Sequence, residues 1–435
     1  MNVTGIIMEC NPFHEGHAYL LREAGKLTRA DYIVVAMSGD FVQRGEPAVF
    51  DKYIRAEQIL RAGADLVLEL PLYAACGSAE YFARGGIALL EKLGVVTDLC
   101  FGSESGDMDN LLLCAKLLAE AEGGDDSSFA GAQAYRKFLQ AGLKNGKPFP
   151  AARAAALEQS FQHVHTVDQE ETALSLRYPS LPNDLLAVEY CRALRLLDSF
   201  IRPHAIPRIR VPSATQRRQH LLQNRGELFP CGGDLLSAGR SARIPDLPRT
   251  SVTQVPLFPI GPDDFSRQLM YALRMNEGEL ETYADVSDDL ASRIRKNLMQ
   301  YTGFTGFCDL LKTRNLTRTR ISRCLLHILL QMRQERLDTL QSQGMALYAR
   351  PLAMNRKAAP LLSAISRKSS LPFLSRLSAA PNLLTPSALS FLEEEIRAED
   401  LYCLTLAAAA APSADEGSGP PVPASQQRKI PTGSA

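Results

Sequence analysis

The chain has 435 residues, of which 46% are hydrophobic and 22% are charged, and its formal net charge is zero. This length and apolar content suffice for two or more domains with cores of their own. The sequence has no run of about 18 apolar residues and no basic N-terminal segment before an apolar stretch, so we expect neither a membrane-spanning helix nor a secretory signal. Its nine cysteines include no Cys-x-x-Cys pair, which indicates reduced thiols and a cytoplasmic protein.

The zero net charge hides an asymmetry between the two halves of the chain. Residues 1–201 contain 18 Lys and Arg against 27 Asp and Glu, a balance of −9. Residues 202–410 contain 28 against 19, a balance of +9. A basic half within a neutral chain indicates that this half binds a polyanion; the alternative is that its positive side chains only solvate helix faces.

The first predicted element is a buried strand that starts at Gly5 and ends at Asn11-Pro12, because proline has no N–H and fixes φ. A helix follows over Gly16–Thr28, with apolar residues at helical spacing on one face. The N–H groups in the first turn of a helix have no partners within the helix and lie at the positive end of its dipole. A strand, a tight turn and a helix N-terminus therefore predict an anion site.

Two histidines lie in this turn. His14 and His17 are three residues apart, so their imidazoles share one face and can donate to one phosphate. They could instead be ordinary surface or core side chains, but the His-x-Gly-His spacing after a strand and a turn favours a phosphate site. A zinc site is the other alternative, and no further His, Cys or acidic residue lies nearby at the usual zinc spacing. We therefore predict His14 and His17 as the catalytic residues, without a metal site built by the protein.

Three further apolar runs of strand length alternate with helical patterns, at Tyr32–Met37, Leu66–Pro71 and Val95–Phe101. This alternation predicts an α/β fold with a doubly wound parallel sheet. The loops at the carboxyl ends of such strands bind ligands. Ser38–Ala48 is one such loop, and Gly102 follows another strand, where a backbone without Cβ either approaches a nucleotide base or only serves its turn.

Two later segments carry polar groups that suit a phosphate. Asn183 lies in the cap of an amphipathic helix over Leu185–Leu197, and Arg208 lies in a short, extended, basic segment. Ser213 and Thr215 begin another helix beside arginines, where hydroxyl and guanidinium groups can bind phosphate. The alternative is an ordinary Ser/Thr helix cap with surface arginines.

Composition divides the chain into four parts. We predict an α/β domain over residues 1–225, a Gly-, Pro- and Ser-rich linker over 226–262, a mainly helical basic domain over 263–406 and a disordered tail over 407–435. Within the helical domain, the pattern predicts one long helix over Thr319–Gln341.

The charge of the helical domain is concentrated around the start of this long helix. The basic side chains there are Lys312, Arg314, Arg318, Arg320 and Arg323. Threonine and serine hydroxyls lie between them, and such a cluster is typical of a surface that contacts the phosphate backbone of a nucleic acid. A second basic stretch begins downstream at Arg350.

Taken in order, these motifs resemble those of the bacterial tRNA(Met) cytidine acetate ligases, a family within the HxGH nucleotidyltransferase superfamily. The segments that carry the resemblance are Glu9–His17, Met37–Ala48, Asp65–Pro71, Phe101–Glu104, Pro182–Tyr190, Lys312–Arg320 and Tyr348–Arg350. The likeness extends from the start of the chain to about Leu404.

The resemblance implies a Rossmann-like ATP-binding domain and a two-step reaction. ATP and acetate give acetyl-adenylate and pyrophosphate, and the acetyl group then passes to N4 of the wobble cytidine (position 34) of elongator tRNA(Met), without acetyl-CoA. Mg²⁺ is expected to bridge the phosphates of ATP. The positions that match the family's ATP site are Ile7, Met8, Glu9, Cys10, Asn11, Pro12, Phe13, His14, Glu15, Gly16, His17, Ala18, Tyr19, Leu20, Gly102, Asn183 and Arg208. The basic half would hold the tRNA by its phosphates while cytidine 34 unstacks.

Three features depart from the family's pattern. A Gly-Tyr-His segment that relatives carry after the position of Arg208 is missing, Asp184 replaces an asparagine, and Arg217 stands where relatives are usually aliphatic. These departures leave two alternatives open. One is an adenylyltransferase or acyl-adenylate enzyme that acts on a small metabolite without tRNA; the other is a tRNA-binding relative with impaired catalysis.

Overall fold

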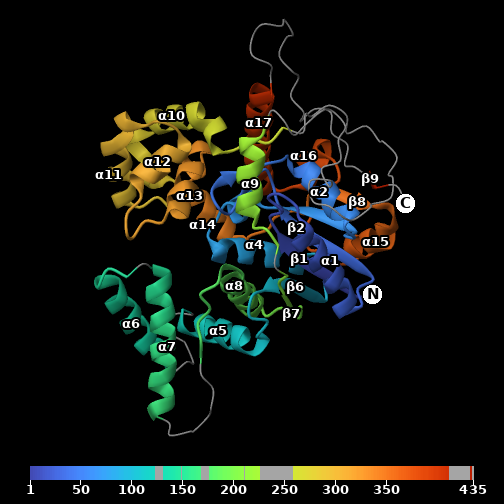
Figure 1. Cartoon of the computed structure of the whole chain (residues 1–435). Helices are drawn as coiled ribbons and strands as arrows, with labels where there is room; N and C mark the ends of the chain where they lie inside the picture. Colours follow the sequence, from blue (N-terminus) through green and yellow to red (C-terminus); the bar gives the residue numbers. More distant parts are fainter. Residues whose placement is uncertain are drawn as a thin grey trace, which may run out of the picture.

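The computed structural model describes residues 1–122, 131–147, 149–167, 176–209, 211–225, 258–410 and 432–433. A central sheet is covered by helices, and a separate cluster of helices lies beside it (Figure 1). Within these ranges, no helix is both long enough and apolar enough to cross a bilayer. Most of the predicted linker, 226–262, and most of the predicted tail, 407–435, lie outside the described residues.

The central sheet has the strand order β7-β6-β1-β2-β5-β8-β9. The five parallel strands are β1 (Val3–Met8), β2 (Tyr32–Ser38), β5 (Leu66–Leu70), β6 (Asp98–Ser103) and β7 (Arg202–Pro207). Strand β8 (Pro351–Asn355) pairs antiparallel with β5, and β9 (Thr432–Gly433) pairs with β8. The predicted α/β fold with a parallel sheet is confirmed, and an antiparallel strand from the C-terminal half extends it.

The alternation of side chains along the strands accounts for two helical layers. All six residues of β1 are buried, as expected for a parallel strand that is covered on both faces. Val3 and Ile7 belong to one apolar cluster, whereas Ile6 and Met8 belong to another. The helices that contribute to the first cluster include α4 (Ala79–Lys92), α5 (Met108–Ala121) and α8 (Pro182–Leu196), and those of the second are α1 (Glu15–Thr28) and α2 (Lys52–Arg61). The sheet is thus doubly wound, as predicted.

The first half contains further strands and helices besides these. They are the hairpin of β3 (Phe41–Val42) and β4 (Glu46–Pro47), and the helices α3 (Leu72–Ala75), α6 (Ala132–Lys144), α7 (Phe149–Val167) and α9 (Ala214–Gln223). Helices α6 and α7 lie side by side and away from the sheet, whereas α9, in which only Arg218 is buried, is a surface helix in the middle of the view in Figure 1.

The C-terminal half builds the second group of helices. Its α-helices are α10 (Ser266–Met275), α11 (Asp288–Asn297), α12 (Phe304–Leu311), α13 (Arg318–Leu329), α14 (Gln334–Ser342), α15 (Ala359–Lys368), α16 (Ala380–Leu383) and α17 (Pro386–Ala410). Short 3₁₀ helices lie between them, at Pro262–Phe265, Glu277–Thr282, Leu298–Gln300, Arg356–Ala358 and Leu377–Ala379. The core formed by α10 to α14 and α17 also contains Phe41, Leu72 and Tyr73 of the first half, so these helices pack directly against the loops of the sheet. Helix α15 instead belongs to the first cluster around the sheet.

The prediction of one long helix over Thr319–Gln341 is wrong. Helix α13 ends at Leu329 and α14 begins at Gln334. Between them Gln331 adopts a positive φ of 58°, and its side-chain oxygen accepts a hydrogen bond from the Tyr283 hydroxyl (2.8 Å). Contacts with a distant segment therefore break the helix, although the local sequence contains no glycine or proline there.

The predicted boundaries at 225 and 263 stay a prediction. Strand β8 and helix α17 nevertheless bring residues of the C-terminal half against the sheet of the first half. Helix α17 also includes residues 407–410 of the predicted tail.

Candidate active site

The loop that follows β2 and the helix α2 after it hold the turn between β1 and α1. The peptide bond Asn11-Pro12 is cis. The Asn11 oxygen Oδ1 accepts a hydrogen bond from the backbone N–H of Val49 (2.8 Å), and the buried Arg55 donates from Nη1 to the Glu9 carbonyl oxygen (2.7 Å). These contacts fix the direction in which the chain enters α1.

We call the segment from Asn11 to His17, between β1 and the first turn of α1, the signature turn. Its two imidazoles are held by reciprocal hydrogen bonds. His14 is the N-cap of α1, and its Nδ1 accepts from the N–H of Gly16 (3.0 Å). The N–H of His14 in turn donates to Nδ1 of His17 (3.2 Å), and the two rings stack with their centroids 3.9 Å apart. Because each Nδ1 is an acceptor, the proton of each neutral ring lies on Nε2. Both rings can therefore donate an N–H to a ligand.

Both imidazoles are neutral at pH 7. Burial lowers the pKa of His14 to about 4, and the positive charges of Arg217 and Arg208 act in the same direction. Burial and the neighbouring His14 hold the pKa of His17 well below its ordinary value. The rings thus act as hydrogen-bond donors of fixed orientation rather than as cations.

The backbone amides of this turn are less available than the sequence predicts. The N–H of Gly16 donates to the His14 ring, and the N–H groups of His17 and Ala18 donate to the His14 carbonyl oxygen (2.9 and 3.3 Å). The prediction of unpaired amides is wrong for these three residues, because the histidine cap satisfies them. An anion here would depend on the imidazole Nε2 atoms and the helix dipole.

The absence of a side chain at Gly16 leaves room for the His14 ring. A Cβ at this position would lie 2.8 Å from His14 Cε1 and 3.3 Å from a methyl carbon of Val211. We expect Gly16→Ala to displace the ring and to weaken ATP binding about 10-fold, the loss of roughly one good hydrogen bond. Alanine's higher helix propensity offsets the lost cap, so the unfolding free energy should change by less than about 1 kcal/mol.

Calorimetric titration with ATP and thermal unfolding measure these two quantities. Gly25→Ala, in the later part of the same helix, is the matched control and should bind ATP as the unchanged chain does. An unchanged affinity of the Gly16→Ala variant would show that the ring position does not matter for ATP.

A second group of predicted residues meets at the carboxyl end of β6. Gly102 lies opposite Ile206 in the register of β6 and β7, and a Cβ on Gly102 would lie 3.3 Å from Cγ of Arg208. The carboxylate of Glu104 accepts hydrogen bonds from the Asn183 amide group and lies 3.8 Å from Arg208 Nη1. The fold thus brings Gly102, Asn183 and Arg208 together, and Glu104 links them, a role that the sequence did not indicate.

The structure explains why position 184 can be an aspartate. The buried carboxylate of Asp184 accepts from the Ser103 hydroxyl and from the N–H groups of Glu104 (2.9 Å) and Ser105 (3.0 Å). The N–H of Asp184 in turn donates to Glu104 Oε2 (2.9 Å). A carboxylate offers two acceptor oxygens for three donors, whereas an amide offers one. This departure from the family's pattern therefore strengthens the loop beside Gly102.

Helix α9 lies against the signature turn. Arg218 donates from Nη1 to the Asn11 carbonyl oxygen (2.8 Å), and Arg217 Nη2 lies 2.5 Å from Glu15 Oε2. The sequence did not indicate either contact, because the partners are about 200 residues apart. Two neighbouring arginines of α9 therefore hold this helix against the signature turn.

The predicted hydroxyls of α9 serve the helix itself. Ser213 caps α9 by accepting from the N–H of Gln216 (3.2 Å), and Thr215 accepts from Arg218 Nη2 (3.3 Å). This arrangement matches the alternative of an ordinary helix cap. Their contact with a phosphate stays a prediction.

The rest of the predicted ATP-binding stretch falls into two parts. From Ile7 to Pro12 every side chain except that of Glu9 is buried, so only the backbone of these residues can meet a ligand. From Phe13 to Leu20 the residues are partly or fully exposed. Side-chain contacts with a nucleotide are therefore confined to the second part and to Glu9.

Comparison with known proteins identifies the family. The family model described as HIGH Nucleotidyl Transferase matches residues 1–416. The tRNA(Met) cytidine acetate ligase of Acetivibrio thermocellus is 36% identical over 424 residues, which cover 93% of this chain and 95% of that protein. The chain belongs to the tRNA(Met) cytidine acetate ligase family. The ligase of Alkaliphilus metalliredigens is 33% identical with the same coverage.

Solved structures agree with this assignment. The crystal structure of Thermotoga maritima TmcAL bound with alpha-thio ATP has a TM-score of 0.76 and 30% sequence identity, and the match covers 92% of this chain and 94% of that chain. The apo form of the same protein gives a TM-score of 0.77. The resemblance to the ligase family and the Rossmann-like fold are thus confirmed.

In this member of the ligase family, the basic cluster surrounds the start of α13. Lys312 and Arg314 are exposed, and Arg318 pairs with Asp309 (2.9 Å). Arg320 is partly exposed, whereas the Arg323 side chain is only 16% exposed and lies 3.8 Å from Asp285. Arg323 is therefore less accessible than Lys312, Arg314 and Arg318.

Helix α13 touches the loop that also holds the signature turn of this ligase-family member. The Ser322 hydroxyl donates to the Gly45 carbonyl oxygen (2.8 Å), and a Cβ on Gly45 would collide with the Arg323 backbone. Gly45 has a positive φ of 75°, which glycine adopts without strain. The basic cluster is thus connected to the carboxyl ends of the parallel strands, where the imidazoles lie.

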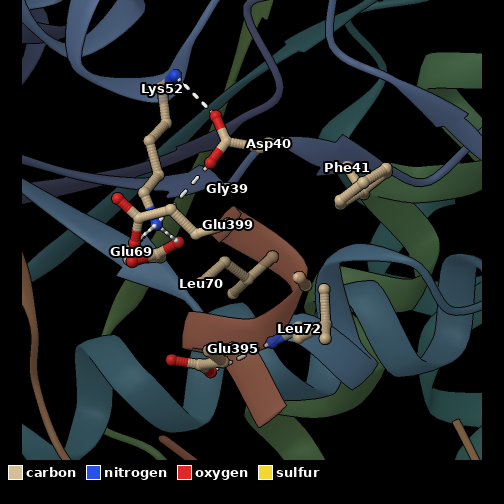
Figure 2. A pocket seen from close by; sticks show the side chains of 10 residues that line it. Gly39, Asp40, Phe41, Lys52, Glu69, Leu70, Leu72, Glu395 and Glu399 are labelled. Atoms are coloured by element: carbon tan, nitrogen blue, oxygen red, sulfur yellow. Dashed lines mark hydrogen bonds and ion pairs between the residues drawn. The ribbon is translucent and has the colours of Figure 1, made fainter. Parts of the chain in front are cut away.

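A buried charge cluster joins this loop to α17. Lys52 Nζ lies 2.6 Å from Glu69, 3.0 Å from Glu399 and 3.8 Å from Asp40, and Arg350 lies 2.9 and 2.8 Å from Glu69 and Glu399. Figure 2 shows Lys52, Glu69, Glu399 and Asp40 beside a cavity of about 10 Å³, which is room for one water molecule at most. Arg350 was predicted in a basic stretch, but it is buried here. We therefore regard the cavity as part of a structural cluster and not as a substrate site.

Proposed function

We propose that this chain is an ATP-dependent ligase that activates acetate as acetyl-adenylate and acetylates N4 of wobble cytidine 34 of elongator tRNA(Met). The observation that carries the proposal is similarity over nearly the whole chain to proteins named as tRNA(Met) cytidine acetate ligases. The imidazole pair at the N-terminus of α1 supplies the chemistry that an adenylate-forming enzyme needs.

In the first step, a carboxylate oxygen of acetate bonds to the α-phosphorus of ATP and the bond to the bridging oxygen breaks, so pyrophosphate leaves. Negative charge builds on the phosphate oxygens during this step. The Nε2–H groups of His14 and His17 and the positive end of α1 would stabilise it. In the second step, N4 of the cytidine attacks the acetyl carbon and loses a proton, and AMP leaves.

The other predicted positions would hold the nucleoside part of ATP. Gly102 offers backbone without a side chain, beside the exposed guanidinium of Arg208. Asn183 stands at the start of α8, where Glu104 fixes it. These roles follow from their positions at the strand ends, where α/β proteins bind nucleotides.

Mg²⁺ would enter with ATP. Among the described residues no group of three His, Cys, Asp or Glu could hold a metal ion by itself. The carboxylate beside the imidazole pair is Glu15, which is paired with Arg217. The surroundings fit an ion carried mainly by phosphate oxygens and water, where it would neutralise the charge of the leaving pyrophosphate.

The tRNA would lie along the start of α13. Lys312, Arg314, Arg318 and Arg320 can contact phosphates there, close to the loop that supports the signature turn. This arrangement would bring a flipped cytidine towards the adenylate while the duplex stem stays on the helical domain.

The test is incubation of the full chain with ATP, labelled acetate and tRNA(Met) transcript, followed by digestion to nucleosides. We expect labelled N4-acetylcytidine. Arg318→Glu with Arg320→Glu should weaken tRNA binding by about 10- to 100-fold through the loss of phosphate contacts and leave acetate-dependent pyrophosphate exchange unchanged. Lys144→Glu with Lys147→Glu, two exposed residues in the acidic half, is the control with equal charge change.

The outcomes separate the alternatives. Pyrophosphate exchange without acetylated cytidine, and with no effect of the arginine changes, would point to an enzyme for a small metabolite. ATP binding without exchange would point to a relative with impaired catalysis.

A further inference from the structure

An ion pair lies directly beside the imidazole pair. Arg217 of α9 contacts Glu15, the first residue of α1, with 2.5 Å between Nη2 and Oε2. The Arg217 side chain is 27% exposed and the Glu15 side chain is 56% exposed. Water screens such a pair, so it contributes little to stability. The pair is therefore of interest for its position beside the imidazoles and not for its contribution to stability.

The Arg217 guanidinium is close enough to both imidazoles to affect them. Its positive charge is among the causes that lower the pKa of His14 and of His17. The next residue, Arg218, anchors α9 to the Asn11 carbonyl oxygen and is largely buried. The backbone of α9 is thus fixed against the signature turn, while the Arg217 head group remains at the surface.

Glu15 creates an electrostatic conflict for a polyphosphate. A carboxylate in the first turn of a helix interacts favourably with the helix dipole, but it repels an anion that binds at the same end. Arg217 neutralises this carboxylate. A guanidinium also forms short, bidentate hydrogen bonds with phosphate, which are stronger than an exposed pair with one carboxylate oxygen.

We propose that Arg217 is an additional ligand for the phosphates of ATP in this chain, held beside the imidazoles by Glu15 and transferred from Glu15 to phosphate when the nucleotide binds. The inference rests on the proposed function, because it takes the imidazole pair as the phosphate site.

A double-variant cycle tests the proposal. Binding of α,β-methylene-ATP to the full chain is measured by calorimetry, without acetate or tRNA, for Arg217→Leu, Glu15→Gln and the combined variant. We expect Arg217→Leu to weaken binding about 10-fold, as for the loss of one charge-assisted contact. Glu15→Gln should bind at least as tightly as the unchanged chain. The combined variant should stay about 10-fold weaker than Glu15→Gln.

The combined variant decides between two roles. If Arg217 only neutralised Glu15, removal of both charges would restore the original affinity, and the proposal would be overturned. Arg217→Lys, which keeps the charge without the bidentate geometry, should recover part of the affinity. If the leucine variant does not fold, the lysine variant replaces it in the comparison with the unchanged chain. No recovery beyond the leucine variant would also count against the phosphate contact.

Two controls separate this inference from the proposed function. His14→Ala with His17→Ala must itself weaken binding; if it does not, the phosphate site has been misplaced and the proposed function loses its support. Arg61→Leu removes an exposed arginine that pairs with Glu57 on α2 (2.6 Å), and it should leave affinity unchanged. If Arg61→Leu weakened nucleotide binding as much as Arg217→Leu, removal of any positive charge would be enough to weaken binding. That result would overturn the specific role of Arg217.

Discussion

Replacement of both imidazoles, His14→Ala with His17→Ala, is expected to lower acetate-dependent pyrophosphate exchange by at least about 10³-fold, because removal of one preorganised donor typically costs 10²–10³-fold. Both Nδ1 atoms are occupied by backbone N–H groups, so the two Nε2–H donors are free for the reacting phosphate. Exchange of labelled pyrophosphate into ATP, with and without acetate, measures the effect.

His14 also caps α1, so a structural role must be separated from a chemical one. Loss of an N-cap costs about 1 kcal/mol, a small part of a total stability of about 5–15 kcal/mol, and the double variant should still fold. His14→Asn is the matched control, because asparagine is a good N-cap without an imidazole. We expect this variant to unfold at the temperature of the unchanged chain and still to exchange pyrophosphate slowly. Exchange at the original rate in either variant would contradict a role for the imidazoles.

Lys52→Met is expected to lower the unfolding free energy by about 3–5 kcal/mol, the usual cost of removing one partner from a buried ion pair. Lys52 is 1% exposed and lies among the carboxylates of Asp40, Glu69 and Glu399, so its removal leaves Arg350 as the remaining cation of the cluster in the described structure. Denaturant unfolding at pH 7 measures the loss.

The pH dependence of this loss gives a second check. Lys52 and Arg350 hold the pKa of Glu399 well below its usual range, so in the unchanged chain this carboxylate contributes stability above the unfolded pKa of about 4.3, and the contribution is lost as the pH falls. Without Lys52 the pKa of Glu399 rises, and the folded state then takes up protons more readily. The difference in unfolding free energy between the unchanged chain and the Lys52→Met variant should therefore become smaller as the pH falls from 7 to 5.

Two further variants make this prediction specific. Lys52→Met with Glu399→Gln removes a positive and a negative charge together and should recover part of the lost stability, as coupled partners do. Lys26→Met removes an exposed lysine that pairs with Glu23, and the unfolding midpoint should not move measurably. A loss of equal size in that variant would mean that the buried cluster has no special role.

The sequence predicts features that arise from neighbouring residues. Strand β1, the turn at Asn11-Pro12, the helix that follows and the paired histidines all lie within one short segment, so this local structure could be predicted. That the histidines bind phosphate stays a prediction. The detail that failed there is the state of the first-turn amides. Histidine is an uncommon N-cap, and the pattern gave no sign that His14 would use its own ring to satisfy the amide of Gly16.

Features that depend on residues far apart in the sequence could not be predicted in this way. Strand β8 has five residues and begins with a proline, and its partner β5 lies in the other half of the chain. Glu104 reaches Asn183 across 79 residues, and neither side chain identifies the other. In the sequence, Arg350 looks like part of a basic surface. In the structure its side chain is buried and forms ion pairs with the carboxylates of Glu69 and Glu399. Such contacts are set by topology, which the local pattern does not specify.

The contribution of α17 to the first half has a consequence for synthesis of the chain. The Tyr402 hydroxyl donates to the Ala48 carbonyl oxygen across 354 residues, and Glu399 reaches Lys52 from the same helix. A ribosome would have to synthesise 354 residues beyond Ala48 before Tyr402 exists, and β5 would present an open edge until β8 is made. The nascent N-terminal half should therefore depend on chaperones until β8 and α17 have been synthesised.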